Sequence, residues 1–584
     1  MDPVRNSPPH RPGGRASAGA ISNEVDIRQN IKEALARAGA ASGIEMTAET
    51  VPLEHTDDFA HGDYASGLAL AGAKAAGIAP RALAEKVVAA LGTIKGVAKV
   101  EIAGPGFINF HIAPKALAQG IERSRTDAAW GKSALHAGKT ILVEYTDPNP
   151  FKEFHIGHLV PNAIGESISR LLEYTGAHVL RANYQGDVGV HVAKSLFILL
   201  EKGITDPSIV DLSAAYPEGS SRYDEDPAAK AAIDTLNKTI YDKSDLQVNA
   251  LYDKGRALSL AHFEEIYEML GTKFDHYFFE NETGPVGAEI VRAHPDIFPE
   301  SEGATIFRGE DYDLHTRVFL TKLGLPTYEA KELGLAKMKE EACDFDLTIT
   351  ITANEQTEYF KVAMKAMELA LPELRGKLAF RTHGLLRFAS GKMSSRTGNI
   401  IRGEDLIEDL ADAAHERAAR SAGWRSAGDA DVLARQIAVA AIKYQILRQA
   451  SHKDIIFDRE RALSLEGDSG PYLQYAHARA HAIIEKAKEQ HVTPAADPAA
   501  EPTPLARLLL RFPDIVAYTA SELEPHLLTS YLLQIAAAFN SWYAQVHIVD
   551  GTSEAAHKIA IADAARATLK NGLWLLGISA PEQM

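Results

Sequence analysis

Cysteine and long apolar runs are almost absent from this chain. Cys343 is the only cysteine among 584 residues. One thiol builds neither a disulfide framework nor a cysteine zinc cluster, so the sequence excludes the small disulfide-rich class and fits a reducing compartment. No run of about 18 apolar residues occurs, which excludes a membrane-spanning helix. We therefore expect a cytoplasmic protein without a membrane partner or a metal site.

Basic residues are outnumbered by acidic ones. Lys and Arg total 61 against 78 Asp and Glu, which gives a net charge of −17. Nucleic-acid binding depends on cations at phosphates, so this balance argues weakly against such a partner, although a local basic patch can still bind RNA. A single hydrophobic core stops growing at roughly 250–300 residues, so several domains are expected.

The first part of the chain separates into a tail and a small domain. Residues 1–20 lack the apolar segment of a signal peptide and contain several prolines, which predicts a disordered tail, with a transit peptide as the alternative. Residues 22–40 and 80–92 have helical spacing, and residues 97–112 alternate around a Gly-Pro-Gly break. The pattern predicts an α+β domain over residues 21–120.

The rest of the chain predicts a parallel-sheet domain followed by helices. Strand and helix patterns alternate within residues 135–400, at 141–146, 160–176, 179–184, 346–352, 358–370 and 377–388. This β-α-β rhythm is typical of a parallel sheet with crossover helices. Residues 204–325 interrupt it and are interpreted as an insertion whose first part is polar and loop-like. Residues 401–584 are helical apart from a low-complexity loop at 491–504, so the expected class is multidomain α/β plus α.

Two short motifs can carry phosphate chemistry. His155-Ile156-Gly157-His158 follows a strand and opens a helix, where free N–H groups and the helix dipole favour phosphate. Lys392-Met393-Ser394-Ser395-Arg396 follows the last expected strand, where a loop lysine can reach departing pyrophosphate. Taken singly, the histidines are as well explained by a capped turn, and the lysine by a solvated loop.

Together, in this order and context, the two motifs resemble those of the class I aminoacyl-tRNA synthetases. Asn149 and Lys152 before the histidines, and the Asn-Tyr-Gln-Gly-Asp-Val-Gly run at 183–189, are similar to the arginyl-tRNA synthetase family, although many members have Trp in place of Val188. The resemblance covers the chain from about residue 22 and leaves 204–258 unmatched. It implies a Rossmann-like catalytic domain, an N-terminal tRNA-contacting domain and a helical-bundle anticodon-binding domain.

The resemblance also implies substrates and site residues. The expected partners are L-arginine, tRNA-Arg and ATP with Mg²⁺, with no zinc or organic cofactor, and a monomer is expected. Arginyl-adenylate forms first and is then transferred to tRNA, a reaction that in this family usually needs bound tRNA for its first step. The implied catalytic and ATP-binding residues are Lys152, His155, Gly157, His158, Lys392, Met393 and Ser394.

An arginine site should offer carboxylates to a planar, permanently charged guanidinium. The residues that match the family pattern are Glu144, Asn149, Tyr328, Glu332 and Gln356. Tyr328 and Glu332 are four residues apart and should share a helix face. Many relatives have Asp where this chain has Glu332. An ordinary surface role is the alternative for each of these residues, least so for Glu144 in an apolar strand.

Lys152 and the C-terminal aromatic residues complete the candidates. Relatives commonly have a second lysine where this chain has Ser395, so Lys152 is interpreted as its replacement at the triphosphate, with Arg396 as the alternative. Stacking on anticodon bases is expected from aromatic side chains, with core packing as the alternative. The candidates for contact with tRNA are Tyr472, Tyr475, Tyr543 and His547, the last two expected on one helix.

Three other functions remain as rivals. One is a class I synthetase for cysteine, lysine or glutamate, against which the missing Cys/His clusters and the Glu144/Glu332 pair argue. Another is a small nucleotidyltransferase, which would not need the helical C-terminal third. The last is a non-catalytic RNA-binding paralogue, which should have lost His155, His158 or Lys392.

Overall fold

The computed structural model describes residues 26–389, 401–418 and 430–584. The predicted tail at 1–20 and the Lys392-Met393-Ser394 motif lie outside the described residues. The chain divides into two compact units, one of residues 1–118 with 498–502 and one of residues 119–497 with 503–584.

The first unit is an α+β fold, as the sequence predicts. Its antiparallel sheet has the order β1-β2-β4-β3. A turn joins β3 to β4, in which Gly106 has φ +138° and passes so close to Pro80 that a Cβ would lie 2.9 Å from its backbone. The elements are α1 (Ile27–Ala41), β1 (Glu54–His55), β2 (Tyr64–Ser66), α2 (Leu68–Ala76), α3 (Pro80–Leu91), β3 (Val97–Ala103) and β4 (Phe107–Ile112). Helix α4 (Pro114–Thr126) runs across the division between the units.

A parallel sheet forms the centre of the second unit. Among the described residues it has five strands in the order β12-β11-β5-β6-β7, and every neighbouring pair is parallel. The strands are β5 (Thr140–Glu144), β6 (His178–Gln185), β7 (His276–Phe279), β11 (Leu347–Ala353) and β12 (Leu378–His383). The expected parallel-sheet fold is confirmed. Because the strands are parallel, their carboxyl ends lie at one edge, the usual place of a ligand site in such sheets.

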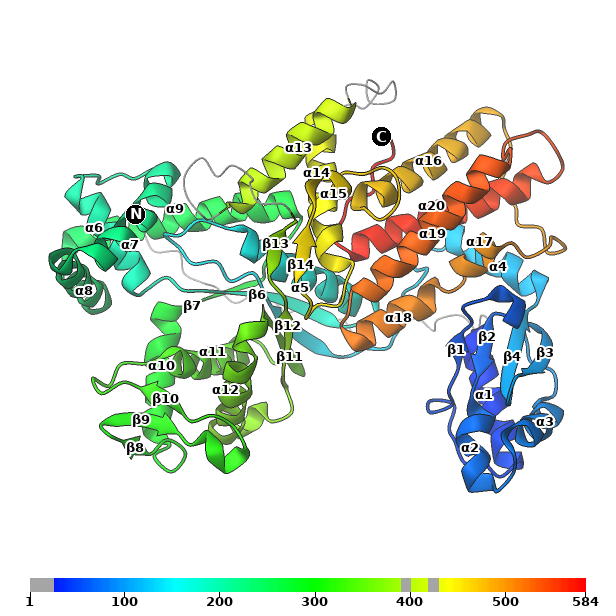
Figure 1. Ribbon diagram of the computed structural model, residues 1–584, viewed down its shortest axis with the longest axis horizontal. Coiled ribbons are helices and arrows are strands. Elements are labelled where there is room, and N and C mark those ends of the chain that lie inside the picture. The colour runs from blue at the N-terminus through cyan, green and yellow to red at the C-terminus, as the bar shows by residue number, and fades with distance from the viewer. Residues whose placement is uncertain (1–25, 390–400, 419–429) are drawn as a thin grey trace, which may run out of the picture. The chain divides into compact units, whose positions relative to one another are not determined.

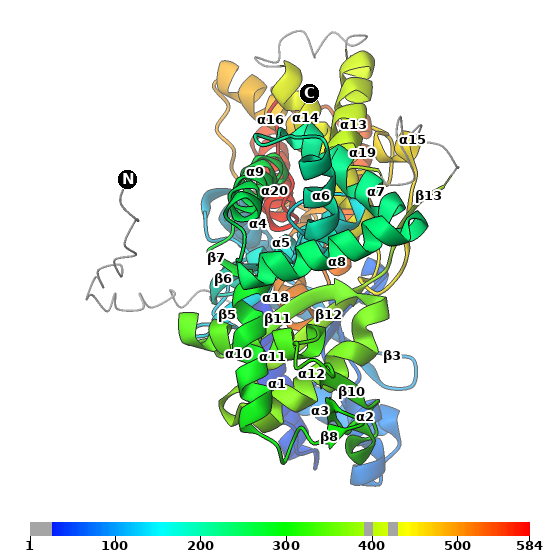
Figure 2. The same ribbon diagram turned by 90° about the vertical axis from the view of Figure 1, so that its left-hand side faces the viewer.

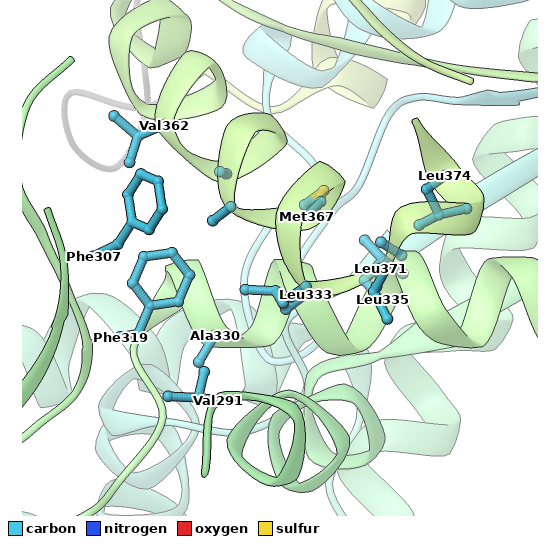
Figure 3. Close-up of a cluster of buried hydrophobic side chains, with 14 of the residues drawn as sticks. Val291, Phe307, Phe319, Ala330, Leu333, Leu335, Val362, Met367, Leu371 and Leu374 are labelled. Carbon is cyan, nitrogen blue, oxygen red and sulfur yellow. The ribbon is translucent and has the colours of Figure 1, made fainter. Parts of the chain in front are cut away.

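Helices follow these strands and bury their apolar faces against the sheet. Helix α5 (Ile156–Tyr174) follows β5, α10 (Glu280–Ala293) follows β7, and α12 (Thr357–Ala370) follows β11, while α11 (Tyr328–Ala342) precedes β11. Figure 3 shows Leu333 and Leu335 of α11 close to Met367 and to Leu371 and Leu374 beyond it. This apolar cluster fixes α11, the helix that carries two candidate arginine ligands.

The expectation of a loop-like start to residues 204–325 is wrong. Helices α6 (Val190–Glu201), α7 (Ile209–Glu225), α8 (Pro227–Asp242) and α9 (Leu246–Leu270) gather into one bundle (Figures 1 and 2). Ser208 and Asp211 form a reciprocal cap that begins α7, and its buried Leu212 and Ala215 pack on the bundle. Pro217 and Gly219 inside α7 imitate a loop composition, which explains the error.

Strands within and after that segment also differ from the expectation. Strand β7 belongs to the main sheet beside β6, so residues 204–325 are not one continuous insertion. A separate antiparallel sheet contains β8 (Glu300–Ser301), β9 (Ala304–Phe307) and β10 (Arg317–Leu320). The strand expected at 377–388 is two strands, because β13 (Leu386–Phe388) leaves β12 to pair with β14 (Ile455–Phe457). Gly384 lies at the break, where a Cβ would lie 2.3 Å from the backbone of Lys453.

The C-terminal part is helical, as predicted, with the loop at 491–504. Helices α14, α16, α19 and α20 pack on one another, and α20 also contacts α5 (Figure 1). The helices are α13 (Gly403–Ala418), α14 (Ala430–Leu447), α15 (Arg459–Ala462), α16 (Gly470–Glu489), α17 (Pro504–Leu509), α18 (Phe512–Glu522), α19 (His526–Gln545) and α20 (Ala555–Leu575). Within the described residues, no helix has the length and apolar character needed to cross a membrane.

Candidate active site

The two histidines of the first motif stand at the N-terminus of α5. His155 is the N-cap residue, and its Nδ1 accepts a hydrogen bond from the backbone N–H of Gly157 at 3.1 Å. His158 Nδ1 accepts from the backbone N–H of His155 at 3.2 Å. The rings stack with centroids 3.9 Å apart. The sequence therefore places both imidazoles together, at the helix end that favours an anion.

These contacts determine which nitrogen carries the proton. Because both Nδ1 atoms accept from backbone N–H groups, a neutral ring has its proton on Nε2. Burial lowers the pKa of His155, and the charge of Lys152 lowers it further. The pKa of His158 is well below its usual range because of burial, then the neighbouring His155 and Lys152. Near neutral pH, both rings are neutral and can donate through Nε2.

The candidate arginine ligand Glu144 is already paired in the structure. It ends β5, and its Oε2 lies 2.6 Å from Nζ of Lys339 on α11. The side chain of Glu144 is 2% exposed and that of Lys339 is 5% exposed. An ion pair at this depth is screened little by water. Lys339 was not predicted as a site residue, although it lies seven residues after Glu332 and therefore on the same helix face.

Glu332 lies in the same acidic neighbourhood. It lines a small pocket with Lys339, Thr348 and Thr350, and the walls are completed by Ala336, Phe345, Phe360, Met364, Met367, Leu378 and Ala379. Burial in this pocket, and then the charge of Glu144, raise the pKa of Glu332 to about 8. Burial and Glu144 also raise the pKa of Asp147 well above its usual range. The neighbourhood therefore has more carboxyl groups than cations to neutralise them.

The other arginine candidates occupy different surroundings. Asn149 lies beside Gly186, where a Cβ would be 2.3 Å from its Oδ1 and 3.3 Å from Oε1 of Glu280. Tyr328 begins α11 and is 68% exposed, with its ring 5.1 Å from Nζ of Lys331. Gln356 is exposed in the short 3₁₀ turn Asn354–Gln356 before α12. The structure thus brings Glu144 and Glu332 together and leaves Tyr328 and Gln356 at the surface.

A second buried ion pair lies next to Asn149 and was also missed. Nζ of Lys331 is 2.6 Å from Oε2 of Glu280, and both side chains are 10% exposed. Burial raises the pKa of Glu280 although Lys331 opposes this. Lys331 is the neighbour of Glu332 in the sequence. Glu280 was not predicted, because it follows β7, which the sequence pattern placed within an insertion.

Lys152 lies between the histidines and the helical bundle. Its Nζ is 4.9 Å from the centre of the Tyr216 ring on α7. Its charge contributes to the low pKa values of His155, His158 and His191. Lys152 is therefore near the N-terminus of α5, as the sequence predicts. The partners Lys392, Met393 and Ser394, and the alternative Arg396, fall outside the described residues.

Two of the tRNA candidates, Tyr475 and Tyr543, both contact Arg479. The guanidinium of Arg479 lies 4.5 Å from the Tyr475 ring and 4.8 Å from the Tyr543 ring, and it donates to Tyr475 Oη at 2.9 Å. Tyr543 is 42% exposed on α19. Tyr472 is in the first turn of α16. The expectation that His547 shares a helix with Tyr543 is wrong, because α19 ends at Gln545.

Comparison with family profiles matches all three regions of the chain. A profile described as tRNA synthetases class I (R), catalytic domain, matches residues 125–459. The arginyl tRNA synthetase N terminal domain matches residues 25–112, and the DALR anticodon binding domain matches residues 473–584.

Curated proteins and solved structures are similar over nearly the whole length. An arginine–tRNA ligase of Chromobacterium violaceum is 33% identical over 96% of this chain and 100% of its own, and one of Clostridium perfringens is 29% identical over 93% and 96%. The Thermus thermophilus arginyl-tRNA synthetase structure superposes with a TM-score of 0.80 at 26% identity, covering 95% of this chain and 100% of that one. The Plasmodium falciparum enzyme has the same fold, with a TM-score of 0.78 at 18% identity, over 96% and 99%.

Proposed function

The chain belongs to the arginyl-tRNA synthetase family and is a class I arginine–tRNA ligase, and we propose how its residues divide the work. The reaction activates L-arginine with ATP and transfers it to the 3′ end of tRNA-Arg. Our assignment has a guanidinium end around Glu144 and Glu332 and a phosphate end around His155 and His158. Mg²⁺ enters with ATP as part of the substrate.

The guanidinium end rests on an excess of carboxyl groups over cations around Glu144. Glu144 has Lys339, whereas burial, and then the charge of Glu144, raise the pKa values of Glu332 and Asp147. A guanidinium supplies the missing positive charge and in-plane N–H donors. The apolar walls formed by Phe360, Met364 and Met367 suit the methylene chain of arginine. Asn149, Tyr328 and Gln356 are proposed to hold the rest of the amino acid.

The phosphate end rests on the protonation state of the two histidines. In the activation step, the arginine carboxylate forms a bond to the α-phosphorus of ATP, and the bond to pyrophosphate breaks. Charge grows on the phosphoryl oxygens, which the Nε2–H groups of His155 and His158 and the end of α5 can stabilise. Gly157 leaves room for the nucleotide. Lys152 and the Lys392-Met393-Ser394 motif are proposed to hold the triphosphate.

The transfer step and the assembly complete the proposal. The tRNA ribose hydroxyl attacks the carbonyl carbon of arginyl-adenylate, and AMP leaves. The proposed tRNA contacts are Tyr472, Tyr475, Tyr543 and His547.

The proposed domains cover residues 21–120, 135–400 and 401–584. A cytoplasmic monomer without zinc stays our prediction.

Pyrophosphate exchange tests the assignment directly. The protein is incubated with ATP, labelled pyrophosphate and each amino acid in turn, with and without total tRNA. Exchange is expected with arginine, with tRNA stimulating it, and not with lysine or citrulline. Lysine cannot make the paired hydrogen bonds and citrulline lacks the charge, so the buried carboxyl groups would lose their partner. Equal exchange with lysine would end the guanidinium assignment.

A further inference from the structure

One aromatic ring of the α6–α9 bundle faces Lys152 at the proposed phosphate end of the site. Tyr216 on α7 lies with its ring 4.9 Å from Nζ of Lys152. This is within the range of a cation–π interaction, in which the negative face of the ring attracts the ammonium group. Tyr216 belongs to residues 204–258, the segment whose sequence gave no indication of a role.

The backbone next to Lys152 is anchored in the same bundle. Phe151 is fully buried with φ +66°, and its ring stacks on Tyr252 of α9 at 5.9 Å. Its N–H donates to Ser259 Oγ at 3.0 Å. A Cβ at Gly255 would lie 2.3 Å from the Phe151 ring, so α9 must have glycine there. The chain before Lys152 therefore has little freedom, and the remaining freedom is in the lysine side chain.

The helix that carries Tyr216 is also packed closely. Helix α7 packs on α6 so closely that a Cβ at Gly219 would lie 2.3 Å from the carbonyl oxygen of Lys194. Leu212 and Ala215, which precede that contact on α7, are buried in the bundle core. The backbone that carries Tyr216 is therefore held in place on the bundle.

Besides the triphosphate, the carboxyl group of Glu280 lies within electrostatic reach of the flexible Lys152 side chain. The charge of Lys152 acts on Glu280, which is buried beside Lys331. A lysine side chain loses rotamer entropy on being fixed. A neutral aromatic face can fix the ammonium group without cancelling its charge, which a carboxylate would do. The charge then remains available to a triphosphate.

We propose that Tyr216 is a positioning residue that holds the Lys152 ammonium group toward the triphosphate, so that the helical bundle takes part in arginine activation. This inference rests on the proposed role of Lys152. The ring does not touch a substrate itself and acts only through the lysine.

The first test compares Tyr216→Phe with Tyr216→Leu. Phenylalanine keeps the aromatic face, so its maximal rate of pyrophosphate exchange should stay within about twofold of wild type. Leucine removes the face and should lower that rate about 3- to 30-fold, which is the range of cation–π energies converted to rates. The KM for arginine should not change. Equal rates for the leucine variant and wild type would overturn the proposal.

A matched control exists on the same helix. Tyr223 also faces lysines, at 4.5 Å from Lys194 and 5.1 Å from Lys230, and no contact between it and Lys152 is found among the described side chains. Tyr223→Leu should leave pyrophosphate exchange unchanged. A loss equal to that of Tyr216→Leu would show that α7 responds to any such change, and the specific role of Tyr216 would be rejected.

A double-mutant cycle separates this inference from the role of Lys152. In the Lys152→Met background, Tyr216→Leu should have no further effect on the maximal rate. An undiminished effect there would overturn the inference while leaving Lys152 in place. A wild-type rate for Lys152→Met alone would instead refute the proposed role of Lys152.

Fluorinated phenylalanines at position 216 keep the test valid if leucine disturbs folding. Fluorine withdraws charge from the ring face while largely preserving its shape. The exchange rate should fall stepwise with the number of fluorines when Lys152 is present and stay constant in Lys152→Met. A rate independent of fluorination with Lys152 present would overturn the proposal.

Discussion

Nζ of Lys339 lies 2.6 Å from Oε2 of Glu144 at the carboxyl end of β5, so the protein itself supplies one cation to the proposed arginine pocket. In the proposed site, Glu144 is paired with Lys339 before arginine arrives, and Glu332 is the carboxyl group left for the guanidinium. The carboxyl groups of the proposed pocket are therefore divided between a fixed lysine and the incoming ligand.

Removal of Lys339 should lower the stability of the protein and increase the stabilisation that bound arginine provides. Lys339→Met leaves Glu144 buried without a cation, which typically costs about 3–5 kcal/mol of unfolding free energy. The melting temperature should fall, and added arginine should raise it by more than it does in wild type. Lys337→Met is the control, because Lys337 is on the same helix but its ion pair with Glu340 is partly exposed. An unchanged melting temperature for Lys339→Met would contradict this prediction.

Arginine binding should become tighter as the pH rises. The free enzyme holds a proton on Glu332 because burial and Glu144 raise its pKa to about 8, and a guanidinium favours the ionised form. Binding below that pH must expel the proton, so the KM for arginine should fall as pH increases from 6 to about 8. Glu332→Gln has no proton to lose, and its arginine KM should be high and flat over that range, with the KM for ATP little changed. A pH-independent arginine KM in wild type would refute the assignment.

The sequence predicted the elements whose signals are local. The parallel sheet, the helix that begins at His155 and the antiparallel strands around Gly106 follow from periodicity and from glycine or proline at turns. The helix α7 was not predicted because Pro217 and Gly219 lie inside it, where a close contact with α6 requires the glycine. That contact is tertiary and leaves no local pattern.

The candidate site was predicted from the sequence without the ion pairs and ring contacts that surround it. Glu144, Glu332, His155 and His158 follow from the resemblance, whereas the neighbouring Lys339, Glu280 and Tyr216 were not predicted. Of these, Lys339 alone was within reach of a sequence argument, as it shares a helix face with Glu332. The other two depend on where β7 and α7 lie in the fold.

Tyr543 offers a test of tRNA contact in the helical region. Its exposed ring is next to Arg479, so a stacked base would meet both a ring and a cation. Tyr543→Ala should raise the KM for tRNA in aminoacylation about 5- to 100-fold, since a stacked base contributes about 1–3 kcal/mol. Tyr518→Ala, another exposed tyrosine on α18, is the control. A lowered melting temperature with an unchanged tRNA KM would indicate a packing role instead.

The role of Lys152 is tested by moving its charge. The triphosphate carries about four negative charges and needs cations placed before the reaction. Lys152→Ala should slow adenylate formation by about a hundredfold, the scale of losing one preorganised group, with the loss in the maximal rate and not in the KM for arginine. Ser395→Lys in that background should restore part of the rate, because it returns a lysine to the loop where relatives have one. Single-turnover formation of arginyl-adenylate is the measurement. If Lys152→Ala keeps the wild-type rate while Arg396→Ala loses it, the second cation is Arg396 and the substitution argument is wrong.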